Sequence, residues 1–126
     1  MIFLDTDVLI DILEKGSKRG EDTIAKIEST EEEVWTTALN LHEVLCGCLK
    51  SSKPVDLLLS MGALPFSMED AKLSSRIESG LEKKGAMVRR IDTMIAATII
   101  NHGGKICTYD LGHFERMTEF GLEFFS

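Results

Sequence analysis

Four acidic residues stand where a carboxylate could take part in chemistry instead of only solvating the surface. Asp5 and Asp110 each follow a short β-prone run. Asp92 opens a helical pattern, and Glu43 lies close to the apolar face of another predicted helix. Acids that converge without a matching Arg or Lys repel one another, so a shared hard cation bound through oxygen is the economical explanation. Taken singly, Asp92 could be a helix N-cap and Glu43 a solvated residue. Taken together, the four predict a metal site.

The first residues of the chain explain why Asp5 is well placed. The run 2–4 is apolar without alternation, which is typical of a strand buried on both faces, and the pattern over 8–13 predicts a helix. We therefore expect Asp5 at the carboxyl end of a central parallel strand, where open α/β sheets bind their ligands. The alternative is that Asp5 or Asp7 is only the N-cap of the following helix.

The remaining chain alternates between strand-like and helix-like segments, which indicates a parallel sheet covered on both faces. We expect a single three-layer α/β/α domain over residues 1–126, with a central, mainly parallel sheet of about five strands. Pro65 marks one strand as an edge strand, because proline cannot donate to a central ladder. Further strands are predicted at 34–37, 63–66, 106–109 and 122–125. Helices are predicted around Ile24 and Ile27 and at 38–49, 55–61, 67–84 and 92–101, with Ser67 as the N-cap of the helix to 84. A turn is predicted at 16–20 and a helical turn at 113–117.

Composition excludes several classes of protein. No apolar run among the 126 residues approaches the length of a membrane span, and acidic residues interrupt what would be a signal-peptide core. Three cysteines are an odd number without a disulfide framework, so we expect a cytoplasmic protein. The net charge of −7 argues against a simple basic nucleic-acid binder. It does not exclude a nuclease, because bound divalent metal inverts the local charge of an acidic pocket.

One further cluster of metal-binding residue types occurs in the sequence. His42, Cys46 and Cys48 lie on one predicted helix, and His42 and Cys46 are four residues apart. A structural zinc site requires four ligands, usually from two separated segments, and a second segment is missing here. We therefore do not expect zinc at this helix.

Four segments of the chain resemble the motifs of PIN-domain ribonucleases, especially the VapC-type toxins. They occur in the family's order and spacing along nearly the whole chain. Where the family often carries Asn or Ser, this sequence has Asp7 and Asp110. The matching segments are FLDTDVLID at 3–11, TTALNLHEVLCG at 36–47, DTMIAA at 92–97, and TYD at 108–110 with Phe114.

This resemblance implies a PIN-like fold and metal-dependent endoribonuclease activity on RNA phosphodiester bonds. One or two Mg²⁺ or Mn²⁺ ions would activate water and stabilise the leaving oxygen. The metal ligands would be Asp5, Glu43, Asp92 and Asp110. Residues that orient water or a ligand would be Thr6, Asp7 and Thr108, and the cations steering RNA would be Arg89 and Arg90, with Lys50 and Lys53 behind them.

The resemblance also implies partners. VapC-type toxins are held by an antitoxin protein, so we expect an antitoxin and a homodimer, without a membrane partner. Within the family, an RNA-processing PIN nuclease without an antitoxin is an alternative that these residues do not separate from a toxin.

Two other classes of function fit less well. A phosphorelay receiver is also an acidic α/β domain, but it requires an Asp ending its third central strand and a Lys ending its last strand. Here Asp56 follows Pro54 in a helical stretch, and Lys105 precedes its strand. An interaction module that has lost its metal is disfavoured, because all four acidic positions are filled.

Overall fold

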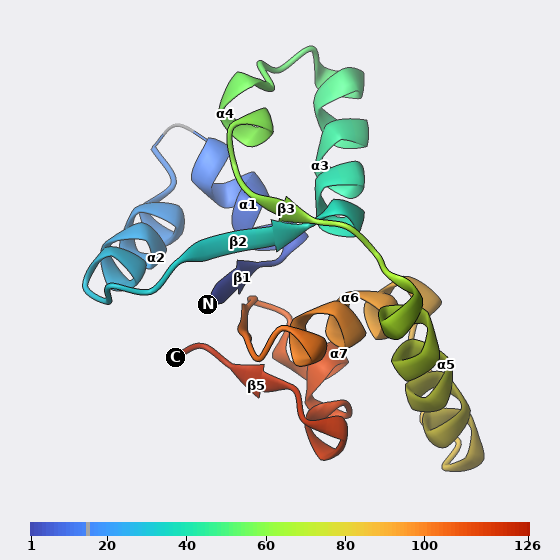
Figure 1. Cartoon of the computed structure of the whole chain (residues 1–126). Helices are drawn as coiled ribbons and strands as arrows, with labels where there is room; N and C mark the ends of the chain where they lie inside the picture. Colours follow the sequence, from blue (N-terminus) through green and yellow to red (C-terminus); the bar gives the residue numbers. More distant parts are fainter. Residues whose placement is uncertain (15) are drawn as a thin grey trace.

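The protein is built on a five-stranded sheet, seen in the computed structural model, which describes residues 1–14 and 16–126 (Figure 1). The strand order is β3-β2-β1-β4-β5, and the four pairings between neighbouring strands are parallel. Strand β3 lies at one edge, as predicted for 63–66, but it ends at Leu64 and Pro65 follows it. The strands are β1 (Ile2–Leu4), β2 (Val34–Thr37), β3 (Ala63–Leu64), β4 (Lys105–Cys107) and β5 (Glu123–Phe124).

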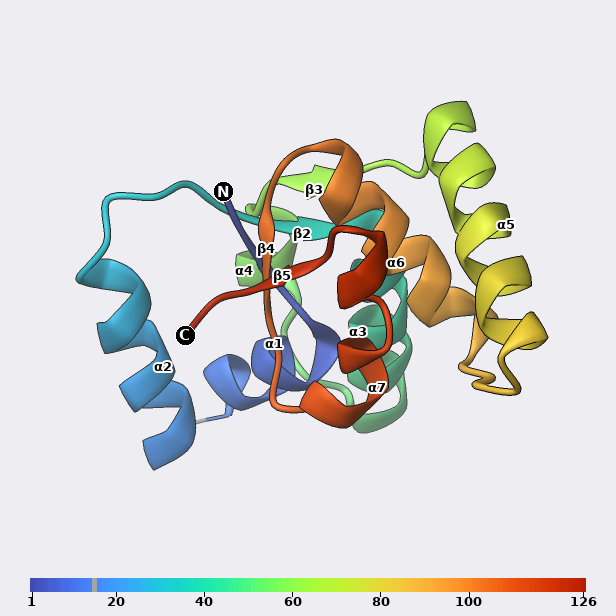
Figure 2. The same ribbon diagram turned by 90° about the horizontal axis from the view of Figure 1, so that it is seen from below.

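Helices cover both faces of this sheet (Figures 1 and 2), which confirms the predicted three-layer α/β/α architecture. In the described residues, α1 to α4 share one apolar cluster with the sheet and α5 to α7 share the other. No helix in this part of the chain is both long enough and apolar enough to cross a membrane. The helices are α1 (Thr6–Leu13), α2 (Lys18–Glu28), α3 (Ala38–Ser51), α4 (Asp56–Leu59), α5 (Met68–Lys83), α6 (Arg90–Asn101) and α7 (Leu111–Glu115), followed by a 3₁₀ turn at Thr118–Phe120.

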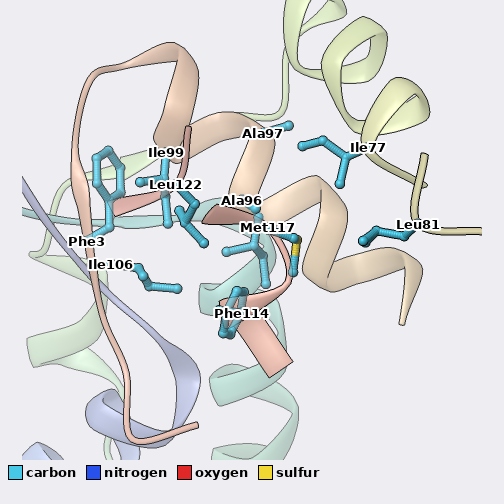
Figure 3. Close-up of a cluster of buried hydrophobic side chains, with 11 residues drawn as sticks. Phe3, Ile77, Leu81, Ala96, Ala97, Ile99, Ile106, Phe114, Met117 and Leu122 are labelled. Carbon is cyan, nitrogen blue, oxygen red and sulfur yellow. The ribbon is translucent and has the colours of Figure 1, made fainter. Parts of the chain in front are cut away.

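Strand β1 is buried on both faces, as its uninterrupted apolar run predicts. Successive side chains of a strand point to opposite faces. Ile2 and Leu4 therefore join the cluster under α1 to α4, and Phe3 joins the cluster under α5 to α7. Figure 3 shows Phe3 beside Ile106 of β4 within this second cluster. Burial of both faces holds the residue that follows β1 in a fixed position.

The turn predicted at 16–20 differs from the structure in its bounds. The turn expected at 16–20 is partly helical, because α2 begins at Lys18 with Ser17 as its N-cap. The side chain of Ser17 accepts a hydrogen bond from the backbone of Gly20 at 3.1 Å. A Cβ atom at Gly20 would stand 2.6 Å from the carbonyl oxygen of Asp11, so this glycine permits close packing of α2 on α1. Glycine is common in turns, but at Gly20 the missing Cβ atom serves helix packing.

The segment around Asp110 also differs from its prediction. Strand β4 ends at Cys107, so Thr108 and Tyr109 lie beyond it. Asp110 is the N-cap of α7, which starts two residues earlier than the predicted 113–117 turn. Short strands at the margin of a sheet end where their neighbours end, and β5 pairs with β4 only at Lys105 and Ile106. The β-prone composition of 106–109 does not show where the neighbouring strands end, so the predicted strand was too long.

A buried acid fastens α5 to α6. Ser67 caps α5 as predicted and forms a capping box with Asp70. Asp70 is fully buried, and its Oδ2 accepts hydrogen bonds from the backbone of Ser67 and the hydroxyl of Thr98, both at 3.0 Å. Its Oδ1 accepts a hydrogen bond from Asn101 at 2.8 Å. Both oxygens are satisfied, so this carboxylate is a structural part of the α5–α6 pair.

Asp70→Asn is expected to lower the free energy of unfolding by about 1–3 kcal/mol, because an amide NH₂ would face donors that now point at a carboxylate. Burial acts to raise the pKa of Asp70, but the hydrogen bonds from Asn101, Ser67 and Thr98 outweigh it and the pKa is lowered. A carboxyl group whose pKa is lower in the folded than in the unfolded protein stabilises the fold at pH values above its unfolded pKa. This stability is lost as the pH falls through the pKa of the folded protein. Urea unfolding of both proteins, at neutral and acid pH, measures the difference.

The control variant is Glu69→Gln in the same helical turn. Glu69 is exposed and pairs with Lys72 at 3.2 Å. Its replacement is expected to change the free energy of unfolding by no more than about 0.5 kcal/mol. Equal effects of the two substitutions would show that the buried network adds nothing to stability.

Candidate active site

Asp5 lies at the carboxyl end of the central strand and is only 8% exposed. Its backbone N–H donates to the carbonyl of Cys107 at 3.0 Å, which extends the pairing of β1 with β4. Asn40 Nδ2 donates to Oδ1 at 2.8 Å, and the Thr108 hydroxyl donates to Oδ2 at 2.7 Å. Both oxygens of this buried carboxylate are therefore hydrogen bonded, by groups from α3 and from the loop after β4.

The end of β2 and the start of α3 set the orientation of Asn40. Thr37 is the N-cap of α3, and its hydroxyl accepts from the Asn40 backbone at 3.1 Å and donates to Asn40 Oδ1 at 2.7 Å. The amide nitrogen of Asn40 is thus directed toward Asp5 and also donates to the Thr6 hydroxyl at 3.1 Å. Thr6 in turn donates to Glu43 Oε1 at 2.8 Å. Asp5 and Glu43 are therefore joined through one chain of hydrogen bonds.

Asp92 joins this network through a cation. It lies in the first turn of α6, its side chain is 3% exposed, and the N-cap of that helix is Arg89. Arg89 Nε donates to Asp92 Oδ2 at 3.1 Å, and Arg89 Nη2 donates to Asp92 Oδ1 at 3.0 Å. Arg89 Nη1 lies 3.7 Å from Glu43 Oε2. The guanidinium group therefore stands between two of the predicted metal ligands.

Burial and like charge raise pKa values at this edge of the sheet. Burial raises the pKa of Asp5 from 3.8 to about 6, opposed by the hydrogen bond from Thr108 and reinforced by the charges of Asp7 and Asp92. Burial also raises the pKa of Asp7, opposed by hydrogen bonds from the Tyr109 and Val8 backbones and reinforced by Asp110. Asp5 and Asp7 are therefore short of compensating positive charge.

Asp7 contacts backbone and not a neighbouring carboxylate. Its Oδ2 accepts from the Tyr109 N–H at 3.1 Å, which ties the start of α1 to the loop after β4. Its Oδ1 is buried, and no residue in the described chain donates to it. The Tyr109 ring is covered by Arg19 at 3.9 Å from the ring centroid. Of the three residues predicted to orient ligands, Thr6 and Thr108 contact predicted ligands, whereas Asp7 holds the loop behind them.

Asp110 is connected to the other acids through its backbone. Its N–H donates to the Thr108 hydroxyl at 3.0 Å, the same hydroxyl that donates to Asp5. Its carboxylate, however, turns to the exposed His113, with Asp110 Oδ2 lying 2.5 Å from Nδ1. The structure thus places Asp110 next to the site with its carboxylate engaged elsewhere, and its part in metal binding stays a prediction.

The other predicted RNA-binding cations lie away from the acidic network of Asp5, Glu43 and Asp92. Arg90 forms a bidentate pair with Glu78 of α5, at 3.0 and 3.1 Å. Lys50 is in the last turn of α3, seven residues beyond Glu43, which is roughly 10 Å along the helix axis. Only Arg89 among the predicted RNA-binding cations touches the acidic network.

The residues fit a divalent cation by their chemistry. In residues 1–14 and 16–126, no three His, Cys, Asp or Glu side chains are close enough as they stand to hold a metal ion together. Asp5, Glu43 and Asp92 nevertheless supply the carboxylate oxygens that Mg²⁺ prefers. The Arg89 guanidinium, bound between Glu43 and Asp92, occupies a place where a cation is favourable. His42 and Cys46 stand 3.7 Å apart on an exposed part of α3, separate from this network.

Sequence reasoning missed the function of Asn40 and assigned Arg89 only to RNA. Asn40 is 1% exposed although it is polar, and it contacts both Asp5 and Thr6. Its position three residues after the helix-capping Thr37 was a usable signal, because this spacing places a side chain back over the N-cap. The pairing of Arg89 with Asp92 at a spacing of three residues was also visible as a helix-surface pair.

Comparison with known proteins places this geometry in a family. The model of the PIN domain matches residues 2–119. The chain is similar to Ribonuclease VapC1 of Rickettsia felis, at 30% identity over 129 residues that cover 97% of this chain and 92% of that protein.

Two solved structures share this fold over nearly the whole chain. VapBC2 from Rickettsia felis, bound to a DNA fragment from their promoter, matches with a TM-score of 0.81 and 22% identity over 100% of both chains. FitAcB from Neisseria gonorrhoeae matches with a TM-score of 0.75 and 26% identity, over 100% of this chain and 97% of that one. The matches to the family model and to the ribonuclease both span nearly the whole sequence, and the chain therefore belongs to the PIN-domain family, among its VapC-like members.

Proposed function

We propose that this chain is a metal-dependent endoribonuclease and the toxin of a VapBC-type toxin–antitoxin pair. The observation that carries the proposal is the network that joins Asp5, Glu43 and Asp92 at the carboxyl edge of the sheet. The 30% identity to a protein named as a ribonuclease supports RNA as the substrate. We also infer that residues 1–126 form one domain, because both apolar clusters are built on the same sheet.

The cofactor of this reaction is proposed to be Mg²⁺ or Mn²⁺. Both ions prefer carboxylate and water oxygens, which is the donor set available here. When bound, such ions supply an activated water and charge stabilisation at the leaving oxygen of the phosphodiester. Asp5, Glu43 and Asp92 would hold them, with Asp110 as a fourth ligand once its carboxylate leaves His113.

The other residues of the network position these ligands. Asn40 and Thr108 bind one oxygen of Asp5 each, so the carboxylate keeps one orientation. Thr6 does the same for Glu43. All three donors are uncharged, and so they orient the carboxylates without cancelling the negative charge that attracts a divalent cation. We assign Arg89 and Arg90 to the RNA backbone, since RNA approaching an acidic protein needs cations at the mouth of the site.

An apolar surface supports the antitoxin part of the proposal. A groove of about 140 Å³ lies between α1 and α3, lined by Ile10, Val44 and Cys48 among others. In the same layer of helices, Leu49 of α3 is 80% exposed and Leu57 of α4 is 62% exposed. Large exposed apolar side chains favour a surface that a partner covers. We assign this surface to an antitoxin, and we also propose a homodimer. An RNA-processing nuclease without an antitoxin is the alternative function.

Asp5→Asn, Glu43→Gln and Asp92→Asn are each expected to reduce RNA cleavage in saturating Mg²⁺. The loss should exceed about a hundredfold, because residues that only support a metal ligand already cost 10–100-fold when replaced. Gel-based cleavage of a total RNA substrate, with folding checked by circular dichroism, measures the loss. Glu78→Gln is the matched control, because Glu78 pairs with Arg90 outside the network. Near-normal turnover in any of the three variants would remove that residue from the proposed metal ligands.

The raised pKa of Asp5 predicts how stability depends on pH and metal. A folded pKa of about 6, against 3.8 for the ordinary group, means that the folded protein holds a proton which the unfolded chain has released. The resulting contribution to the free energy of unfolding is complete at pH values below the unfolded pKa. It is lost as the pH rises through the pKa of the folded protein. Metal-free protein should therefore lose stability between about pH 4 and pH 6 from this group. Asp7, whose pKa is also raised, acts in the same direction.

Metal should reverse that loss, because a divalent ion binds the ionised carboxylates in their folded geometry. At a hundredfold excess over its Kd, it stabilises by about 2.7 kcal/mol. Thermal melts of wild type and Asp5→Asn across this pH range, with EDTA or Mn²⁺, provide the measurement. The variant should lose the part of the pH dependence that Asp5 contributes and most of the stabilisation by metal. A wild-type midpoint that does not respond to Mn²⁺ would contradict the metal site itself.

The toxin proposal predicts that expression of the chain alone arrests growth and degrades RNA, while Asp92→Asn does not. Co-expression of its cognate antitoxin should restore growth. Leu49→Glu should keep cleavage activity but escape this protection, since a charge would enter the proposed antitoxin surface. Met68→Glu on α5, at a residue that is 74% exposed, is the matched control and should remain protected. Unaffected growth with a fully active purified nuclease would favour the RNA-processing alternative, and a monomer at micromolar concentration would contradict the homodimer.

A further inference from the structure

Arg89 and Arg90 are adjacent, and each forms a bidentate pair with a carboxylate, but their partners differ. The partner of Arg90 is Glu78, whose side chain is 35% exposed on the surface between α5 and α6. The partners of Arg89 are Asp92, at 3% exposure, and Glu43, at 24% exposure. Arg89 itself remains 62% exposed, so its guanidinium closes the acidic network from the solvent side.

The bidentate pair of Arg89 Nε and Nη2, called here the Arg89 fork, occupies both oxygens of Asp92. Nε and Nη2 each bind one oxygen, and no other side-chain donor in the described residues contacts that carboxylate. The same guanidinium faces Glu43 Oε2, the oxygen that Thr6 does not bind. Asp92, followed by Glu43 and Asp5, raises the pKa of Arg89, as expected for a cation held by several acids. A divalent cation would need the same oxygens that this fork now holds.

We infer that Arg89 is an internal counter-ion of the acidic site, which binds Asp92 and Glu43 in the metal-free protein and is displaced when a divalent cation binds. This inference rests on the proposed metal-dependent function. In each state one cation compensates the carboxylates, and so the site is never left with its full negative charge. The half-exposed side chain can leave without disturbing the core, and it then remains at the mouth of the site as a cation available to an RNA phosphate.

The exchange predicts that removing Arg89 strengthens metal binding. Arg89→Gln should bind Mn²⁺ about three- to tenfold more tightly than wild type, the range that corresponds to losing a competing, partly exposed bidentate ion pair. Isothermal titration of the metal-free proteins with Mn²⁺, in the absence of RNA, gives the affinities. Without metal, the melting temperature of Arg89→Gln should fall, and saturating Mn²⁺ should restore it.

Arg90→Gln is the matched control. It removes one positive charge from the same turn of α6, but its carboxylate partner is Glu78, outside the site. Its affinity for Mn²⁺ should equal that of wild type. Unchanged or weaker binding by Arg89→Gln would overturn the inference, as would equal tightening in both variants, since a general charge effect would then explain the result.

A second measurement needs no variant. The ¹⁵Nε resonance of Arg89 in wild type should move on addition of diamagnetic Mg²⁺, and its proton should exchange faster with water once the fork is released. The Arg90 resonance should remain in place. An unmoved Arg89 resonance at saturating Mg²⁺ would overturn the inference while leaving the metal site intact. Failure of wild type to bind either ion would instead contradict the proposed function.

Discussion

A buried carboxylate at the end of the central strand is the constraint on which the rest of this site depends. Strand β1 is covered on both faces, so Asp5 leaves the sheet where water cannot solvate it freely. An ionised carboxylate in such a place requires donors from neighbouring elements. Asn40 supplies one from the first turn of α3, and Thr108 supplies the other from the loop after β4. Three separate parts of the chain must therefore be folded together before this acid is compensated.

The acids of the site are compensated in two different ways. Asp5 is held by neutral donors, which orient a carboxylate and leave its charge in place. Glu43 accepts a neutral donor, Thr6, on one oxygen and faces Arg89 with the other. Asp92 is held by a guanidinium fork, which orients it and also neutralises it. A site that used only cations would have little affinity for metal, and one that used only neutral donors would carry strong repulsion in the folded protein. The combination compensates part of the negative charge and still leaves an acidic centre.

The sheet divides the molecule into regions with different surfaces. Its carboxyl edge carries the acidic network, and the layer of α1 to α4 carries the exposed apolar side chains of Ile10, Leu49 and Leu57. The opposite layer of α5 and α6 is fastened by the fully buried Asp70. Chemistry, partner binding and structural support are thus assigned to different parts of the same 126 residues. This separation is what makes the control variants of α5 independent of the site.

The sequence alone determined the alternation of strands and helices, the burial of β1, the cap of α5 at Ser67, and the position of Asp5 at the carboxyl end of the central strand. These properties depend on periodicity and local capping, which are written in neighbouring residues. It also indicated that Glu43 and Asp92 would lie near Asp5, since parallel strands and the helices after them share one edge. Only the tertiary structure decided which groups those acids contact.

Asn40, Arg89 and Asp110 illustrate the difference. Asn40 and Arg89 are ordinary polar residues in sequence, and their functions depend on α3 and α6 meeting beside β1. Asp110 was read as a strand end, but β4 stops at Cys107 and the carboxylate caps a helix and binds His113. A side chain chooses its partner from the groups that packing brings within about 3 Å, and hydrogen bonds at that range follow from contacts between distant segments. Periodicity in the sequence describes one helix or strand at a time, so it does not predict contacts between distant segments.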